Sequence, residues 1–266
     1  MFVLDGYFIA TDLLSHTGED QVFSLMMEQA LLVRAMDVRK GDHFLEICLG
    51  SGVNTLFAAS RGAARAVGID ISARAIAFAQ ANALVNLWPE RGEARLETLQ
   101  GNLFGPLHPQ DQFDLILINP PFELVPHGEG YFLHSHGGED GLDVIRAFLP
   151  DLKARLKPGG RFEMFTWAPG DRHNERVSTL VAAALPGYRV EVIQADCLPL
   201  EQRIATFRNK PGYQQWKNRL EGQGITHVWG VHVHAIESET PEIVRIEAGK
   251  LVAECFAIAS EWSPVE

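Results

Sequence analysis

The chain has 266 residues, 46% of them hydrophobic, and a formal net charge of −11 at pH 7. A chain of this length can bury a large hydrophobic core, as one domain or at most two. No apolar stretch approaches the ~18 uncharged residues that a membrane span needs. The first residues, MFVLDGYFIATD, lack the basic region of a signal peptide. We therefore expect a cytoplasmic protein.

Charge and cysteine content narrow the possible partners. No block of Lys or Arg stands out, whereas a nucleic-acid-binding protein needs a positive face for phosphates. Cys48, Cys197 and Cys255 stand singly, so neither a disulfide framework nor a thiolate metal site is expected. We expect no nucleic-acid or membrane partner, and the oligomeric state stays open.

The first forty residues are expected to cover a binding site. The segment FVLDGYFIA is strand-like, and Thr17-Gly18-Glu19-Asp20 resembles the start of a helix that continues through QVFSLMMEQALLVRAM. We interpret residues 1–40 as a lid and helix segment over the mouth of a site. Residues 41–266 are expected to build that site, within a single domain overall.

A strand, a glycine turn and a helix follow in DHFLEICLGSGVNTLFAAS. The run from His43 to Cys48 is apolar enough for a buried strand, with Glu46 near its end. Gly50 and Gly52 allow the backbone to turn sharply and to approach a ligand closely. The pattern predicts a ligand at the carboxyl end of this strand.

Two more turns follow predicted strands. ARAVGIDIS is interpreted as a strand that ends at Asp70, where a carboxylate is placed to accept both hydroxyls of a ribose. In LQGNLFG, Asn102 and Leu103 are placed to meet the edge of a purine. Together these residues indicate a ligand that contains a nucleoside.

The most informative feature is Asn119-Pro120-Pro121-Phe122, at the end of the apolar run FDLILI. The prolines fix the backbone and remove two N–H donors, so nearby carbonyls face little local competition. The Asn119 side-chain oxygen and the Pro120 carbonyl then form a rigid pair of acceptors. Such a pair suits a planar N–H2 group, and Phe122 offers a face for stacking.

These motifs, in this order and at these spacings, resemble the class I S-adenosylmethionine-dependent methyltransferases over roughly residues 40 to 195. The resemblance implies S-adenosyl-L-methionine as the cofactor, held by Glu46, Cys48, Gly50, Gly52, Asp70, Ile71, Asn102, Leu103 and Asn119. It also implies catalytic roles for Asn119, Pro120 and Phe122, because NPPF belongs to members that methylate nitrogen. GNLF and HGGEDGLDVIRAFLPDLKARLKPGGRF resemble the protein-glutamine methyltransferases that modify translation release factors.

The sequence departs from that family in three places. Cys48 stands where the motif has its first glycine, and Asn102 stands where it has an aspartate. Cysteine is small enough for the turn, and Asn102 can still bond an adenine amino group through its oxygen. Only about forty residues precede the glycine motif, too few for the helical docking domain expected of release-factor methyltransferases.

The remaining segments complete an α/β fold. After a KPGG turn, RFEMFTW is the fifth strand, ERVSTLVAAAL a helix and YRVEVIQA the sixth strand. Residues 211–223 are expected to form a short helix, ITHVWGVHVHAIES the last strand, and EIVRIEAGKLVAECFAIA either a strand pair or a helix. We predict a Rossmann-like class I methyltransferase fold: a doubly wound, seven-stranded, mostly parallel sheet with a reversed last strand.

The long loop after NPPF is expected to cover the acceptor. Five of its side chains could contact the acceptor or take a proton: Glu123, His127, Tyr131, His134 and His136. The pairs His134-x-His136 and His232-x-His234 could each place two imidazoles on one side of an extended chain. An alternating strand explains the second pair without a metal, so we expect no metal site.

Four functions remain open at this point. The first is an N-methyltransferase for an amine or amide nitrogen of a small molecule, favoured by the acidic charge and the missing docking domain. The second is a protein-glutamine N-methyltransferase acting on a release factor or another protein. The third enzyme displaces at the aminopropyl carbon of the cofactor and releases methylthioadenosine. The fourth is a cofactor-binding module without turnover.

Overall fold

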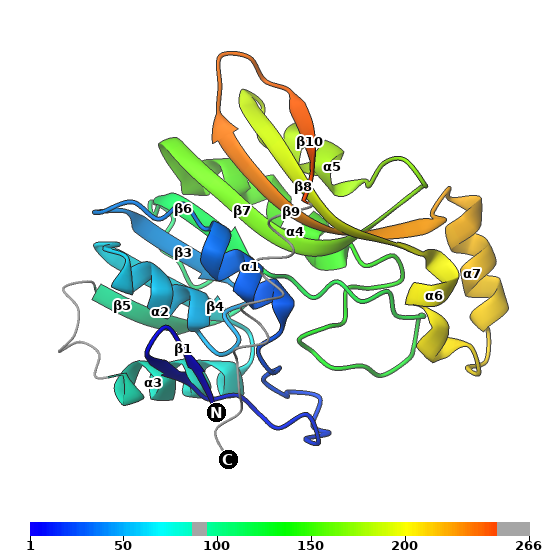
Figure 1. The fold of residues 1–266 in the computed structure, drawn as a ribbon, viewed down its shortest axis with the longest axis horizontal. Helices are drawn as coiled ribbons and strands as arrows, with labels where there is room; N and C mark the ends of the chain where they lie inside the picture. The colour runs from blue at the N-terminus through cyan, green and yellow to red at the C-terminus, as the bar shows by residue number, and fades with distance from the viewer. Residues whose placement is uncertain (87–94, 249–266) are drawn as a thin grey trace.

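An eight-stranded sheet forms the centre of the computed structural model, which describes residues 1–86 and 95–248 (Figure 1). The strand order is β10-β8-β9-β7-β6-β3-β4-β5, and only β9 runs antiparallel to its neighbours. The strands are β3 (His43–Ile47), β4 (Arg65–Asp70), β5 (Arg95–Gln100), β6 (Phe113–Ile118), β7 (Leu156–Gly170), β8 (Tyr188–Pro199), β9 (His227–Glu237) and β10 (Ile243–Glu247).

Helices cover both faces of this sheet. The central strand β6 reads FDLILI and is buried at every position except Asp114, as expected for a parallel strand covered on two sides. A small hairpin of β1 (Phe2–Leu4) and β2 (Tyr7–Ile9) precedes the first helix. The helices are α1 (Met27–Ala35), α2 (Val53–Ser60), α3 (Ala73–Val85), α4 (Asp143–Arg155), α5 (Val177–Ala184), α6 (Leu200–Arg203), the 3-10 turn η1 (Ala205–Phe207) and α7 (Tyr213–Gly222).

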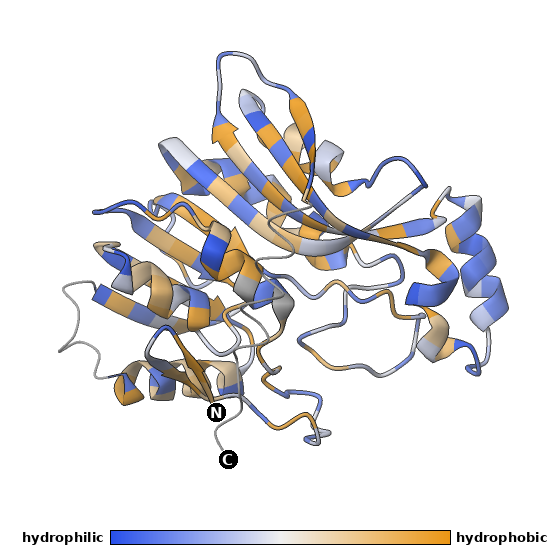
Figure 2. Cartoon of the chain, viewed as in Figure 1, coloured by the Kyte–Doolittle hydropathy of each residue, from blue (hydrophilic) through white to orange (hydrophobic). Residues whose placement is uncertain are grey.

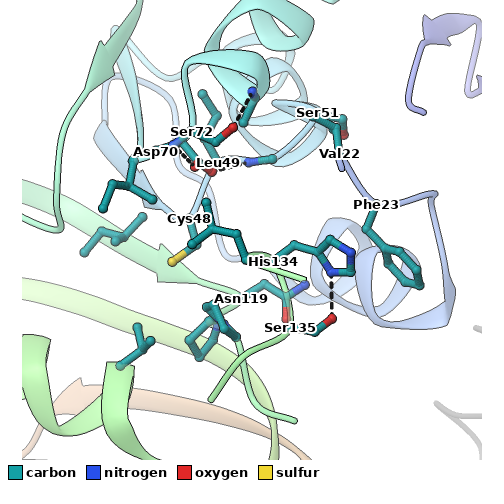
Figure 3. Close-up of a pocket in the computed structure, with 18 of the residues that line it drawn as sticks. Val22, Phe23, Cys48, Leu49, Ser51, Asp70, Ser72, Asn119, His134 and Ser135 are labelled. Carbon is teal, nitrogen blue, oxygen red and sulfur yellow. Dashed lines mark hydrogen bonds between the residues drawn. The ribbon is translucent and has the colours of Figure 1, made fainter. Parts of the chain in front are cut away.

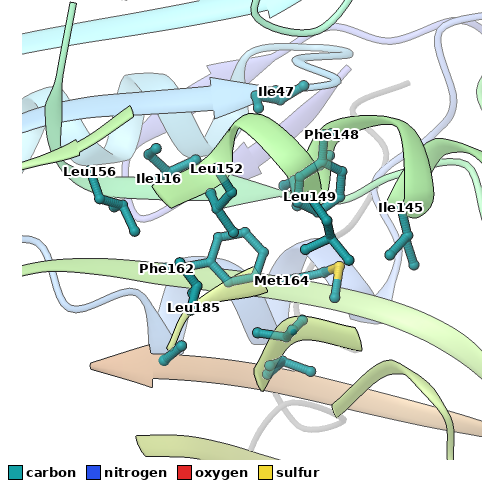
Figure 4. Close-up of a cluster of buried hydrophobic side chains, with 14 of the residues drawn as sticks. Ile47, Ile116, Ile145, Phe148, Leu149, Leu152, Leu156, Phe162, Met164 and Leu185 are labelled. Atoms are coloured by element: carbon teal, nitrogen blue, oxygen red, sulfur yellow. The ribbon is translucent and has the colours of Figure 1, made fainter. Parts of the chain in front are cut away.

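Two hydrophobic clusters occupy the two faces. Because side chains alternate along a strand, Ile116 packs into the cluster under α4 and α5, whereas Leu115 and Leu117 pack into the cluster under α1 and α2. Figure 4 shows the first cluster, with Phe148 of α4 near Phe162 of β7; their ring centroids are 5.8 Å apart. Full burial of one such side chain contributes about 1.5–3 kcal/mol.

A third cluster lies beyond the sheet, around the segment that joins β8 to β9. Trp216 and Leu220 of α7 are buried there, although most of α7 is hydrophilic (Figure 2). Leu124 and Val125, which follow the NPPF motif, belong to the same cluster. The segment α6-η1-α7 therefore supports the loop that begins at the end of β6.

The predicted fold class is confirmed, with one added strand. The reversed strand β9 lies between β7 and β8, and β10 extends the edge by pairing in parallel with β8. The segment EIVRIE, for which strand and helix were both open, is thus a strand at Ile243–Glu247. The rest of that segment, from residue 249, lies outside the described residues.

Two local predictions were wrong. KPGG is not a turn before the fifth strand, because β7 already begins at Leu156; Gly159 has φ 73°, and the pairing with β6 shifts register nearby. The N-terminal helix does not begin after Asp20 but at Met27. Gln21 is held by tertiary bonds instead: its amide donates to the carbonyl oxygens of Leu13 and His16.

Candidate active site

A cavity of about 590 Å³ opens over the carboxyl ends of β3, β4 and β6 (Figure 3). Most of the residues singled out in the sequence line it: Glu46, Cys48, Gly50, Asp70, Ile71, Asn102, Leu103, Asn119, Pro120, Phe122, Glu123, His134 and His136. Gly52 and Tyr131 are not part of its wall, and His127 lines a second, charged cavity beside α7. Residues of the N-terminal segment close one side: Asp20, Gln21, Val22, Phe23, Leu25, Met26, Glu28 and Gln29.

The turn after β3 has the backbone geometry that the glycine motif requires. Gly50 and Gly52 have φ 54° and 77°, and Cys48 has φ 61°, in the left-handed region that favours glycine. At Gly52 the requirement is also one of space, because a Cβ there would lie 2.7 Å from the Cβ of Ala79 on α3. Gly52 thus allows α2 and α3 to approach, and it shapes the cavity without lining it.

Glu46 supports the turn from beneath. Its carboxylate accepts hydrogen bonds from the Asn54 side chain at 2.8 Å and from the backbone and hydroxyl of Thr55 at 2.9 and 2.5 Å. Burial raises the pKa of Glu46 to about 7, against the effect of these donors. The carboxylate therefore fixes the first turn of α2 to β3, and both of its oxygens are already engaged.

Asp70 fastens the same turn to the end of β4. One carboxylate oxygen accepts the Gly50 N–H at 2.9 Å, and the other accepts the Ser72 N–H at 2.9 Å. Burial raises the pKa of Asp70, while these backbone donors lower it. Each oxygen of an ionised carboxylate has a second lone pair, so Asp70 can still accept bonds from a ligand in the cavity.

Asn119 presents an unused acceptor at the end of β6. Its Oδ1 is buried and accepts no hydrogen bond from the residues that the structure describes. Pro120 beside it is buried, and Phe122 packs edge-on to Phe165 with ring centroids 6.2 Å apart. The motif is therefore rigid, and its acceptor is not satisfied by the protein.

The loop after NPPF is tied to the N-terminal segment through His134. The imidazole stacks on Phe23 and Phe132 with centroid separations of 4.7 and 5.3 Å, and its ring nitrogens contact Gln21 at 3.2 Å and Ser135 at 2.6 Å. Burial lowers the pKa of His134 to about 4, so the ring is neutral at pH 7. His134 thus holds the two sides of the cavity together.

Among the cavity residues that sequence patterns did not identify are Trp167, near the end of β7, and Arg203, at the end of α6. The Arg203 guanidinium contacts the Glu123 carboxylate at 2.5 Å and lies 4.6 Å from the centre of the Trp167 ring. Glu123, directly after NPPF, was the one sequence signal for a cation at this place, because a buried carboxylate needs a cationic partner. Nothing local in the sequence identifies which cation.

Within residues 1–86 and 95–248, no group of three or more His, Cys, Asp or Glu side chains is arranged to hold a metal ion. No helix in the same ranges is both long and apolar enough to cross a membrane.

Comparison with known proteins gives the following relatives. Residues 20–128 match the family model described as "Conserved hypothetical protein 95". A Methanocaldococcus jannaschii protein provisionally named protein N5-glutamine methyltransferase is 32% identical over 136 residues, which are 49% of this chain and 64% of that protein. Release factor glutamine methyltransferases of Koribacter versatilis and Caulobacter vibrioides are 32% and 37% identical, over 45% and 44% of this chain and 44% and 43% of theirs.

Among solved structures, the ribosomal protein L11 methylase of Lactobacillus delbrueckii subsp. bulgaricus aligns with a TM-score of 0.48 and 15% identity. The alignment covers 80% of this chain and 78% of that one.

The strand order, with its reversed β9, is that of the class I S-adenosylmethionine-dependent methyltransferase fold, and the chain is similar in sequence to methyltransferases over about half of its length. Within that class, the relatives named above carry the names of protein-glutamine methyltransferases. The chain spans less than two thirds of the length of each of these relatives.

Proposed function

We propose that this protein is an S-adenosylmethionine-dependent N-methyltransferase whose acceptor is the side-chain amide of a glutamine in a protein. The buried, unpartnered Oδ1 of Asn119 is the observation that carries the proposal. An unsatisfied buried acceptor costs about 1–3 kcal/mol, which an N–H2 group bound at this position would offset. The carbonyl of Pro120 lies between two prolines and can accept the second N–H.

The residues present fit the cofactor at the β3–β4 end of the cavity. Asp70 would accept the ribose hydroxyls, the turn from Cys48 to Gly50 would lie against the methionine portion, and Asn102 would meet the adenine edge. Ile71 and Leu103 line the same end and supply apolar contacts. The bound cofactor would supply a methyl group that its sulfonium already activates.

The protein's own contribution is to position the nitrogen. An amide nitrogen is a poor nucleophile because its lone pair is delocalised. Asn119 and Pro120, by accepting both N–H groups, would raise the electron density on nitrogen and fix its direction, while Phe122 stacks on the amide plane. His134 and the N-terminal segment would keep water out of the cavity.

The relatives favour a protein acceptor over the small molecule that the sequence analysis put first. Two of them are named for release factors and another, from Bradyrhizobium diazoefficiens, for ribosomal protein uL3. None of these four relatives is named for a small-molecule acceptor. A small amine or amide is therefore the alternative acceptor, and the experiment below includes it.

The acceptor class is tested with methyl-labelled S-adenosylmethionine and a panel of acceptors. The panel holds a translation release factor, ribosomal protein uL3, free glutamine and small primary amines. We expect label in a protein, located at a glutamine by peptide mass spectrometry, with S-adenosylhomocysteine as the second product. Label only in the small amines supports the small-molecule function instead, and methylthioadenosine as product supports aminopropyl displacement.

Replacement of Asn119 tests the site itself. Asn119→Ala removes one acceptor and leaves the proline turn, so turnover should fall by about 10²-fold or more. Binding of S-adenosylhomocysteine, measured by calorimetry, should change little. Asn119→Asp is the matched variant, because it keeps an acceptor but adds charge, and it should lose less activity toward a cationic amine than toward an amide. Wild-type turnover in Asn119→Ala would mean that NPPF is only a structural turn.

A further inference from the structure

The Glu123 carboxylate lies one residue beyond the NPPF motif and lines the acceptor end of the cavity. Its backbone is held on both sides: the Glu123 N–H donates to the Ser135 carbonyl at 2.7 Å, and the Gly137 N–H donates to the Glu123 carbonyl at 3.0 Å. The position of this carboxylate is therefore set by the same rigid segment that sets Asn119.

Arg203 reaches the same carboxylate from the segment α6-η1-α7. Its Nη2 donates to Oε1 of Glu123 at 2.5 Å, and the two side chains are only 18% and 22% exposed. Trp167 supports the guanidinium at 4.6 Å, and Phe122 lies 5.9 Å away. A single charge-assisted bond thus fixes one oxygen of Glu123, whereas the other accepts no hydrogen bond within residues 1–86 and 95–248.

Further contacts hold this segment against the loop. The Lys210 ammonium pairs with Glu129 at 2.7 Å, and the Trp216 indole N–H donates to the Glu139 carbonyl at 3.1 Å. The Tyr131 ring packs on Phe207 of η1, with centroids 5.6 Å apart. Arg203 is therefore not a mobile surface cation, because the element that carries it is fastened at several points.

Methylation of an amide nitrogen leaves a proton that must go to a base. The Asn119 and Pro120 oxygens accept hydrogen bonds but are too weakly basic to keep a proton. Both ring nitrogens of His134 are engaged, with Gln21 and Ser135. The free oxygen of Glu123 belongs to the carboxylate that directly follows the NPPF motif and lines the same cavity as Asn119.

We propose that Glu123 accepts the proton that leaves the acceptor nitrogen, and that Arg203 is the positioning residue that holds the Glu123 carboxylate for this step. The inference rests on the proposed N-methyltransferase function. The nitrogen lone pair would form the new bond to the methyl carbon, and the electron pair of the broken carbon–sulfur bond would leave with S-adenosylhomocysteine. The N–H bond breaks, and its electron pair stays on nitrogen. The proton forms an O–H bond with the free oxygen of Glu123 and passes to solvent when the product leaves.

The surrounding charges suit such a base. The charged and titratable groups that face Glu123 are Arg203 from α6, Glu28 from α1 and Tyr131 from its own loop, and His136 forms a backbone bridge with it. Burial raises the pKa of Glu123, Glu28 raises it further, and Arg203 lowers it. The carboxylate is thus more basic than an exposed glutamate, and the Arg203 charge favours its ionised form.

Kinetics of Glu123→Gln test the base. Glutamine has the same size and can bond Arg203, but it cannot take a proton, so kcat on the glutamine acceptor that the wild type methylates should fall by about 10²-fold or more. S-adenosylhomocysteine affinity, measured by calorimetry, should stay at the wild-type value. If Glu123→Gln turns over at the wild-type rate, the base is overturned and the proposed function stands. If the wild type methylates no acceptor on the panel, the proposed function itself fails, and the base with it.

The pH profile tests Arg203. Activity should be lost as pH falls through the pKa of Glu123. Arg203→Met should move this acidic limb of the kcat/KM profile to higher pH, because the positive charge that lowers the Glu123 pKa is gone. Arg203→Lys should restore part of the shift. Arg208→Met is the matched control, because Arg208 pairs with Glu201 on the surface of the same segment, with both side chains more than half exposed. An unchanged profile in Arg203→Met overturns the positioning role.

A readout without turnover completes the test. In protein labelled with carboxyl-13C glutamate, the Glu123 resonance is assigned as the one missing in Glu123→Gln. We expect it to titrate above the ordinary glutamate value and to titrate higher still in Arg203→Met, but not in Arg208→Met. A Glu123 titration that is the same with and without Arg203 overturns the coupling between the two residues.

Discussion

At the scale of single residues, Cys48 is a side chain in a backbone conformation made for glycine. Its φ of 61° lies in the left-handed region, which costs a residue with a Cβ about 1–2 kcal/mol. The thiol packs beside the core, and burial raises its pKa, so it stays protonated at neutral pH. Cys48 therefore serves as a small filler of the turn, not as a nucleophile.

Substitutions of different shape at Cys48 should separate strain from packing. Cys48→Gly relieves the backbone strain but loses the side-chain packing, so its free energy of unfolding should lie within about 1 kcal/mol of the wild type. Cys48→Val places a β-branched residue in the left-handed region and should lose on the order of 2 kcal/mol. Urea unfolding measures both. A valine variant as stable as the glycine variant would contradict the assigned backbone geometry.

Asp70 is the residue on which we expect cofactor affinity to depend most. Asp70→Ala should weaken binding of S-adenosylhomocysteine by on the order of 1–3 kcal/mol, through lost charge-assisted bonds and through release of the Gly50 amide. Asp70→Asn keeps one acceptor oxygen and should lose less. Calorimetry measures both variants, and wild-type affinity in Asp70→Ala would rule out the ribose assignment.

The sequence located Asp70 and Asn119 because each ends an apolar strand, and the ends of parallel strands meet at one edge of the sheet. It could not locate Arg203, which lies 80 positions from its partner Glu123 and reaches the cavity only through the packing of α6 and α7. It also could not show that the Glu46 oxygens are used by α2. Local sequence patterns predict where along a strand or turn a residue lies, but not which distant side chain it contacts.

At the scale of elements, Asp12 holds the N-terminal segment in place beside the cavity. Asp12 accepts hydrogen bonds from the Val22 backbone at 2.8 Å and from Arg74 of α3, and so closes residues 12–22 into a loop beside the cavity. These tertiary bonds explain why residues 21–26 are not helical despite their helical apolar spacing. Tertiary contacts also determine the structure at β10. Its sequence pattern fitted a strand and a helix equally, and it forms a strand because it pairs with the edge strand β8.

Replacing Asp12 should weaken the cover in a pH-dependent way. The hydrogen bonds from Arg74 lower the pKa of Asp12 to about 2, so its contribution to stability is present above its ordinary value of 3.8 and is lost as pH falls toward 2. Asp12→Asn should cost about 1 kcal/mol at pH 7, because Arg74 is partly exposed. Chemical unfolding of the wild type and Asp12→Asn should show that the difference between their free energies of unfolding becomes smaller as pH falls toward 2. Equal stabilities at pH 7 would contradict the role of Asp12.

At the scale of the whole molecule, the class I fold is extended at one edge. The strands that build the ligand end, from β3 to β6, lie at the half of the sheet that does not carry β10, and α6-η1-α7 meets the acceptor loop from the other half. The proposed cofactor end depends on β3 and β4, whereas the proposed acceptor end depends on the end of β6 together with α6-η1-α7. A substitution at one end should leave the other intact, which is why cofactor affinity and turnover can be measured as separate properties.

That separation leads to a prediction for the stability of the entire chain. A ligand that binds only the folded state adds about 2.7 kcal/mol at a hundred times its Kd. For a chain of this size, we expect that gain to raise Tm by about 5–10 °C. S-adenosylhomocysteine should produce this rise in scanning calorimetry of the wild type and of Asn119→Ala alike, because Asn119 acts on the acceptor. Asp70→Ala should show a much smaller rise at the same ligand concentration. If all three proteins melt unchanged with the ligand present, the cavity over β3 and β4 is not a cofactor site; if only Asn119→Ala loses the rise, the motif at the end of β6 holds the cofactor rather than the acceptor nitrogen.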